Sequence, residues 1–198
     1  MENPNEAVVW QHLKQGDKRA LDYFYDTYVQ SLYNYGRKIT NHEALVKDCI
    51  QELFIDIWRN RNTLSYPRSL KFYLLKSLRY KIIHQLKKEK RKLQIEHLSL
   101  DMTGDHEPSY EFDLIASQCT LEKQQQLRKG LKKLSNRQRE AVVLKFYEEL
   151  SYEEIASVMS VHPQSVYNLI HQSIEILKKS LIIEITLFAL LQSMLLFF

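Results

Sequence analysis

Glycine and proline are scarce in this chain, since each occurs four times in 198 residues. Folds built from many short strands need frequent tight turns, and these two residues supply most of them. Hydrophobic residues make up 44% and charged residues 26%, values ordinary for globular proteins, which excludes disorder of the whole chain. An all-α fold of one domain or two small domains is therefore expected.

Residue types that serve metals and catalysis are also few. The two cysteines, Cys49 and Cys119, can form neither a disulfide framework nor a multi-thiolate zinc site. The seven histidines lack ligand spacing, and no nucleophile–base pair or phosphate-binding loop occurs. We expect no enzyme activity, metal, cofactor or small-molecule substrate. The N-terminal ten residues are polar and unlike a signal peptide, so a cytoplasmic location is expected.

Charge is segregated along the chain. Residues 68–92 carry ten basic residues and one acidic residue, whereas residues 93–127 carry one basic and seven acidic. The net charge of the whole chain is only +4. A basic block of this kind is typical of a surface that binds nucleic acid. A solvated helix face beside a solvated linker would have the same charge pattern. Charge alone therefore does not decide between this interpretation and a nucleic-acid-binding surface.

Apolar residues recur every three or four positions, which predicts a series of helices. Gly16 is expected to end the first helix, Asp17 to cap the second and Asn41 to cap the third. The acidic segment contains Gly104 and Pro108 and is typical of a linker. The predicted helices span about 6–14, 18–38, 42–60, 70–91, 121–133, 136–147, 151–159 and 163–181. The predicted domains are 1–92 and 121–181, with a linker at 93–120 and a hydrophobic tail at 182–198.

The helix predicted over 70–91 has two different sides. Leu75, Leu78, Ile82 and Leu86 form one narrow apolar stripe that should face a core. The opposite side is basic with interleaved rings, and it holds Tyr73, Lys76, Tyr80, His84, Lys87 and Arg91. Cations neutralise phosphates and flat rings stack on unpaired bases, so this pattern favours nucleic acid. Each tyrosine alone would be better explained as partial core.

Residues 151–178 are typical of a helix, a tight turn and a second helix. Ser151 and Glu154 form a capping-box pair, and Pro163 suits the first position of the following helix. Gln164 and Asn168 lie on the polar side of that helix, where an amide can pair with adenine in the major groove. A plain solvated helix face would have the same composition.

These segments, in this order, resemble the extracytoplasmic-function group of bacterial RNA polymerase sigma factors. The stretch DCIQELFIDIW at 48–58 looks like their signature helix, and Gly16-Asp17 with Ala20, Tyr25 and Tyr28 resembles the first helix of region 2. LSNRQRE at 134–140, LSYEEIA at 150–156 and Ser165-Val166 resemble region 4. The resemblance covers about 6–92 and 121–180. It implies an all-α, two-domain factor that binds core polymerase and directs promoter-specific initiation.

The resemblance also implies a role for each surface. The 42–60 helix would bind the largest subunits of core polymerase through Asp48, Gln51, Glu52, Phe54, Trp58 and Arg59. The following loop and helix would melt and read the −10 element of promoter DNA, through Asn62, Ser65, Tyr66, Lys71, Phe72, Tyr73, Lys76, Arg79, Tyr80, His84, Lys87 and Arg91. The second domain would read the −35 element through Arg137, Arg139, Ser151, His162, Gln164, Ser165, Tyr167, Asn168, His171, Gln172 and Lys178. An anti-sigma protein is a further partner that the family allows, and membrane contact would be indirect.

Some positions depart from the family pattern. Tyr80 and His84 stand where the family often has Asn and Asp, and Tyr167, Asn168 and His171 stand where its recognition helix often has Arg or Lys. The promoter sequence therefore does not carry over from relatives. Phosphate anchoring in the second domain would fall to the Arg137/Arg139 segment or to the lysines at 178 and 179.

Two other functions stay open at this point. One is a stand-alone helix-turn-helix regulator with an N-terminal sensor domain, which would bind promoter duplex without polymerase. The other is a helical interaction or RNA-binding protein, which would not recover core polymerase in a pull-down.

The last 18 residues contain 14 apolar ones. As a membrane anchor, the 14-residue run after Glu184 is short of the roughly 17–25 residues that a span needs. The tail could instead form a helix that docks between the domains and hides the DNA-binding surface. The favoured interpretation is an extension of the last helix that completes the core or meets a partner.

Overall fold

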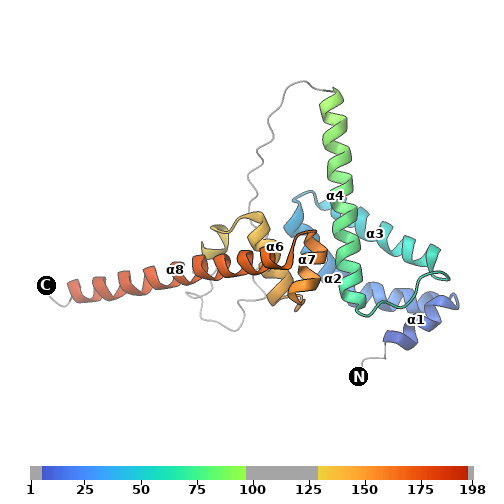
Figure 1. Cartoon of the computed structure of the whole chain (residues 1–198), viewed down its shortest axis with the longest axis horizontal. Helices are drawn as coiled ribbons and strands as arrows, with labels where there is room; N and C mark the ends of the chain where they lie inside the picture. The colour runs from blue at the N-terminus through green and yellow to red at the C-terminus, as the bar shows by residue number, and fades with distance from the viewer. Residues whose placement is uncertain (1–5, 97–128, 196–198) are drawn as a thin grey trace. The chain divides into compact units, whose positions relative to one another are not determined.

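The computed structural model describes residues 6–96 and 129–195, with side chains for 6–90 and 129–179. Every regular element in the described residues is a helix, which confirms the predicted all-α class (Figure 1). The chain divides into two compact units, Met1–His106 and Glu107–Phe198. The predicted linker lies outside the described residues, except that its first four residues, 93–96, are the helical end of α4.

The first unit consists of α1 (Glu6–Lys14), α2 (Lys18–Ile39), α3 (Glu43–Asn60) and α4 (Leu70–Glu96). The last three pack against one another in pairs, and α1 packs on α2. Each helix contributes its apolar stripe to one core, since burying these faces is what stabilises short helices in water. The largest fully buried side chains of the unit are Trp10, Leu13, Leu32, Tyr35, Val46, Leu53, Leu74, Leu75, Leu78 and Ile82.

Two of the three predicted helix boundaries are confirmed and one is wrong. Gly16 adopts φ +87° after α1, and the Asp17 carboxylate accepts the Arg19 N–H at 2.9 Å. Asn41 does not cap α3, because His42 occupies that position and makes no side-chain cap bond. The Thr40 hydroxyl accepts the His42 N–H at 3.2 Å instead. The Thr40 hydroxyl thus bonds the backbone just before α3, and the N-cap residue His42 makes no side-chain cap bond.

Gly36 lies where α2 closely approaches α3. A Cβ built there would lie 2.5 Å from Cγ1 of Val46 and 3.2 Å from Cδ1 of Ile82. Real Cβ atoms do not tolerate the first distance, so only glycine fits against α3 and α4 at this point.

The second unit contains a helical stretch at 129–132, then α6 (Asn136–Phe146), α7 (Tyr152–Met159) and α8 (Pro163–Leu195). Complete capping boxes begin α6, from Ser135 to Gln138, and α7, from Ser151 to Glu154. The first was not predicted and the second is confirmed. All three helices pack together, and α7, a turn at Ser160 with φ 56° and α8 form the predicted helix-turn-helix.

The last helix continues to Leu195, beyond the end near 181 that periodicity predicted (Figure 1). The tail therefore extends this helix as far as Leu195, as the favoured interpretation predicted. The side chains of the hydrophobic tail lie outside the described residues, so its role stays a prediction. None of the helices in the described ranges is long and apolar enough to cross a membrane.

Candidate nucleic-acid interface

The basic side of α4 is exposed for most of its length. Leu75, Leu78 and Ile82 are buried, as predicted, and on the other side Tyr80 keeps 74% of its surface exposed. The rings of Tyr80 and His84 stack, with centroids 6.2 Å apart and planes at 22°. The surface therefore offers a ring pair to solvent among basic side chains. Of the predicted contacts on this helix, Lys76, Tyr80, His84 and Lys87 are exposed, whereas Lys71, Phe72, Tyr73 and Arg79 are half-buried. The side chain of Arg91 lies outside the described residues.

The loop between α3 and α4 is the second part of the predicted −10 surface. Asn62 and Ser65 are exposed, and Tyr66 is 39% exposed. The Tyr66 ring meets Trp10 of α1 edge-on, and its hydroxyl donates to Glu6 of α1 at 3.4 Å. The predicted base-binding tyrosine is therefore held by the N-terminal helix.

The outer side of α3 presents most, but not all, of the predicted polymerase contacts. Its polar members are exposed: Asp48, Gln51, Glu52 and Arg59. The prediction that Phe54 contacts core polymerase is wrong, because the residue is 5% exposed and its ring centroid lies 5.1 Å from that of Tyr25. Its ring supports α3 from within instead of facing a partner. Trp58 is half-buried beneath the guanidinium of Arg61, 4.4 Å from its ring centroid.

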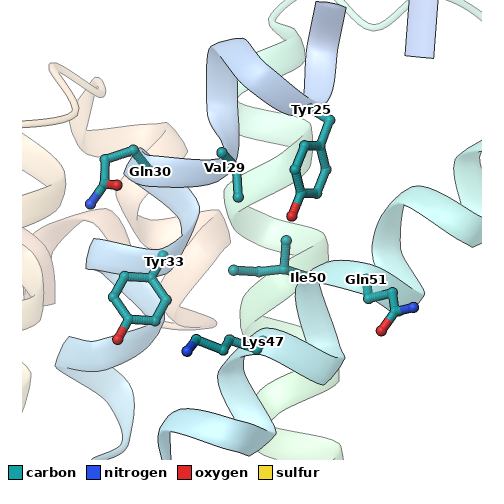
Figure 2. Close-up of a pocket in the computed structure, with 7 residues that line it drawn as sticks. All are labelled: Tyr25, Val29, Gln30, Tyr33, Lys47, Ile50 and Gln51. Atoms are coloured by element: carbon teal, nitrogen blue, oxygen red, sulfur yellow. The ribbon is translucent and has the colours of Figure 1, made fainter. Parts of the chain in front are cut away.

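A pocket of about 550 Å³ lies between α2 and α3. Figure 2 shows side chains from the two helices facing one another across it. It is lined by Tyr25, Val29, Gln30, Tyr33, Lys47, Ile50 and Gln51. Of these, only Gln51 was predicted as a contact residue. Tyr25, Val29 and Tyr33 could have been found from their spacing of four, which forms a second stripe beside the core stripe of α2.

The polar side of α8 is exposed as predicted. The Gln164 amide donates to Oδ1 of Asn168 at 3.2 Å, so these two side chains form one amide pair. Tyr167 is 53% exposed and stacks on His171, with centroids 6.3 Å apart and planes at 21°. The ring of Tyr152 on α7 lies 6.1 Å from that of Tyr167. The exposed residues of this side are His162, Gln164, Ser165, Tyr167, Asn168, His171 and Gln172.

The second unit supplies fewer phosphate anchors than the sequence suggested. The prediction that Arg139 contacts DNA is wrong, because its guanidinium donates to the carbonyls of Leu131 at 3.5 Å and Leu134 at 3.1 Å. Burial lowers the pKa of Arg139, as expected for a charge withdrawn from water. The Ser151 hydroxyl is likewise occupied in capping α7. The predicted anchors that remain exposed are Arg137 at the start of α6, Lys178, which lies 3.5 Å from Glu175, and Lys179.

The reading side of this unit is poor in basic residues other than histidine. Residues 146–177 contain no lysine or arginine and five acidic residues. The nearest cation before them, Lys145, donates to the Leu150 carbonyl at 3.3 Å and lies 4.8 Å from the Tyr152 ring. Any DNA contact by α7 and the first turns of α8 must therefore be made without lysine or arginine.

Comparison with known proteins agrees with this arrangement. Residues 24–92 match the family model described as Sigma-70 region 2, and residues 124–177 match the one described as Sigma-70, region 4. Together the two matches cover more than half of the chain, which therefore belongs to the sigma-70 family of RNA polymerase sigma factors. Like its relatives, this sigma factor acts in promoter recognition, and the stand-alone regulator is not favoured.

Relatives of this sigma factor align over nearly their whole length. The ECF RNA polymerase sigma factor SigW of Bacillus subtilis (strain 168) is 23% identical over 176 residues, 85% of this chain and 92% of SigW. The RNA polymerase sigma factor YlaC of the same organism is 25% identical over 167 residues, 82% of this chain and 92% of YlaC.

Solved structures share the fold of this sigma factor. The sigma factor RpoE in complex with the anti-sigma factor NepR from Bartonella quintana has a TM-score of 0.56 at 20% identity, covering 81% of this chain and 95% of that one. CnrH in complex with the cytosolic domain of CnrY also has a TM-score of 0.56, at 18% identity, covering 89% and 96%.

Proposed function

We propose that this sigma factor divides promoter recognition between two chemically different surfaces while α3 and α2 hold it on core polymerase. The α4 face and the loop before it bind and read the melted −10 element, and the α8 face reads the −35 duplex. Core polymerase and promoter DNA are its partners, and it acts in the cytoplasm, where both are found.

The stacked rings among cations on α4 support the −10 assignment. Single-stranded nucleic acid is bound by basic surfaces that follow the backbone and by rings on which bases stack. Tyr80 and His84 stack on the side of α4 that also carries Lys76 and Lys87. The exposed loop residue Asn62 offers hydrogen bonds to a flipped base.

The amide pair on α8 supports the −35 assignment. Duplex DNA keeps its bases stacked, so a protein reads their edges in the major groove. Because Asn168 accepts from Gln164 through Oδ1, this bond does not use the NH2 donor of Asn168. The amide oxygen of Gln164 supplies an acceptor close by, so the two side chains together offer the donor and acceptor that adenine requires.

The pocket between α2 and α3 supports the polymerase assignment. It combines apolar walls with the amides of Gln30 and Gln51 and the ammonium group of Lys47, as is usual for a protein contact. Asp48 and Gln51 continue the polar surface along α3. We extend an anti-sigma partner to this chain as well, since RpoE and CnrH were both solved with a bound protein.

The exposed Tyr80–His84 stack in a basic surrounding is the observation that carries the proposal. Run-off transcription with purified core polymerase on a promoter library tests it. We expect transcripts from a defined subset of promoters that depends on both core enzyme and this chain. Promoter-duplex binding of equal strength without polymerase would instead support a stand-alone regulator.

A further inference from the structure

The N-terminal helix α1 precedes the segment 24–92 that matches Sigma-70 region 2. Two of its side chains nevertheless contact Tyr66, the aromatic residue of the loop between α3 and α4. A helix outside the matched segment therefore holds a residue that the proposed function places at the −10 element.

One carboxylate of α1 joins three parts of the first unit. Glu6 Oε1 accepts the hydroxyl of Tyr28 on α2 at 2.5 Å. Glu6 Oε2 accepts the hydroxyl of Tyr66 at 3.4 Å. The difference in length means that Glu6 is fixed firmly to α2 and holds the loop more weakly. The loop is therefore tethered to a carboxylate that the helical core already keeps in place.

A buried ring of α1 supports the same tyrosine from another side. Trp10 is 1% exposed, and its ring lies 5.7 Å from that of Tyr66 at an interplanar angle of 63°. It also lies 5.9 Å from Phe24, a buried residue of α2. The Trp10 ring thus packs against both α2 and the loop. Edge-to-face ring contacts of this kind stabilise one relative orientation.

The hydroxyl of Tyr66 stays a donor at physiological pH. Partial burial and the neighbouring carboxylate of Glu6 both raise the pKa of Tyr66, so its phenol keeps the proton that it donates. The contacts with α1 leave the residue 39% exposed. Part of the ring thus remains available to DNA while the rest is held by the protein.

We propose that Glu6 and Trp10 are positioning residues that set base selectivity at the −10 element by fixing Tyr66. The inference rests on the proposed function of the loop. A pocket selects one base only if its walls are ordered before the base arrives, because ordering a loop during binding costs free energy that the correct base must supply. Glu6 and Trp10 provide this order through the hydroxyl and the ring of one residue.

The test is transcription by the full chain with core polymerase on promoters randomised separately at the −10 and −35 elements. Glu6→Ala should lower the base preference at one −10 position about 3- to 10-fold, as expected for loss of one ordinary hydrogen bond. Preferences at −35 should not change. Val8→Ala is the matched control, because Val8 is on the same helix and 51% exposed.

A double-mutant cycle separates positioning from general stability. Tyr66→Phe removes the hydroxyl that Glu6 accepts, so Glu6→Ala should add no further loss of −10 preference in that background. Trp10→Phe keeps a ring and should lose less preference than Trp10→Ala. Should the Trp10 variants fail to fold, the cycle of Glu6 with Tyr66 decides alone.

Some results would overturn the positioning role of Glu6, and one would overturn the proposed function on which that role rests. Equal losses at −10 and −35 in Glu6→Ala would assign Glu6 a structural role only. Additive losses in the cycle would show that Glu6 does not act through Tyr66. If substitution of Lys76 and Lys87 abolishes promoter use while Glu6→Ala keeps its −10 preference, the positioning role fails and the proposed function stands. If the wild-type chain starts no transcription with core polymerase, the proposed function itself fails.

Discussion

The exposed sides of α4 and α8 carry the same pair of rings in opposite electrostatic surroundings. Tyr80 stacks on His84, and Tyr167 stacks on His171, with nearly equal centroid distances of 6.2 and 6.3 Å. The basic block around the first pair has ten basic residues and one acidic residue at 68–92, whereas 146–177 has no lysine or arginine. The shared ring geometry therefore does not distinguish the two surfaces, but their charge does.

This difference indicates how affinity and selectivity are distributed. Phosphate contacts give affinity that falls with salt and is nearly independent of sequence. Base-edge contacts give selectivity without releasing counterions. We therefore expect the first unit to supply most of the salt-dependent affinity for promoter DNA and α8 to supply selectivity.

The effect expected to be largest across promoter sequences, because it applies to all of them, comes from removing cations beside the first ring pair. Lys76→Gln with Lys87→Gln should reduce the slope of log affinity against log salt by about 1.4, or about 0.7 for each single-strand phosphate that is no longer neutralised. At about 0.15 M salt this corresponds to affinity about 14-fold weaker for every promoter sequence. Filter binding of the polymerase complex over a salt series measures it, with Lys18→Gln as a control for charge. An unchanged slope would show that this side of α4 does not follow phosphates.

The next effect concerns the ring itself. Tyr80→Ala should weaken binding to a promoter with a pre-melted −10 region by about 1–3 kcal/mol, the usual contribution of one base stack. Tyr80→Phe keeps the ring and should retain most of the affinity. Binding to pre-melted and fully paired templates is compared by fluorescence anisotropy. Equal losses for Ala and Phe would point to the hydroxyl and contradict stacking.

A narrower effect is expected on α8. Asn168→Ala should reduce selectivity by about 1–3 kcal/mol at a single −35 base pair while leaving the salt slope unchanged. Competition binding with −35 variants measures the change. Gln164→Ala should affect the same base pair, because the two amides form one unit. A uniform loss on all sequences would contradict a base contact.

The smallest expected effect concerns the cap of α7, the helix that packs against α8. Ser151→Ala removes the cap of α7 and should lower the free energy of unfolding by about 1 kcal/mol. Thermal unfolding measures this loss, and Ser151→Asp should restore much of it. If base selectivity at −35 falls far more than stability does, Ser151 also contacts DNA, as the family resemblance implied.

Helix positions and the exposed faces could be predicted because they depend on local periodicity. The stripe of Leu75, Leu78 and Ile82 is enough to orient Tyr80 and Lys76 outward. The hydrogen bonds and ring contacts of individual side chains could not be predicted this way. Nothing in the sequence near Arg139 shows that its guanidinium binds the carbonyls of the preceding turn.

The remaining errors have the same origin. Phe54 belongs to a signature helix and was expected to face a partner, yet Tyr25 on another helix packs against it. Asn41 has a good capping side chain, but the hydroxyl of Thr40 already binds the His42 N–H. In each case a neighbour that the pattern does not reveal decides the role of the residue.

The missing side chain at Gly36 has a consequence for assembly. Because α2 and α3 meet there without a Cβ, a single added methyl group would force Val46 away and widen the separation of the two helices. The pocket of Tyr33 and Lys47 lies between these same helices, close to Gly36 and Val46 in sequence. The width of the pocket proposed to contact core polymerase thus depends on the absence of a Cβ at Gly36. We therefore expect a substitution at Gly36 to impair folding and binding to core polymerase together.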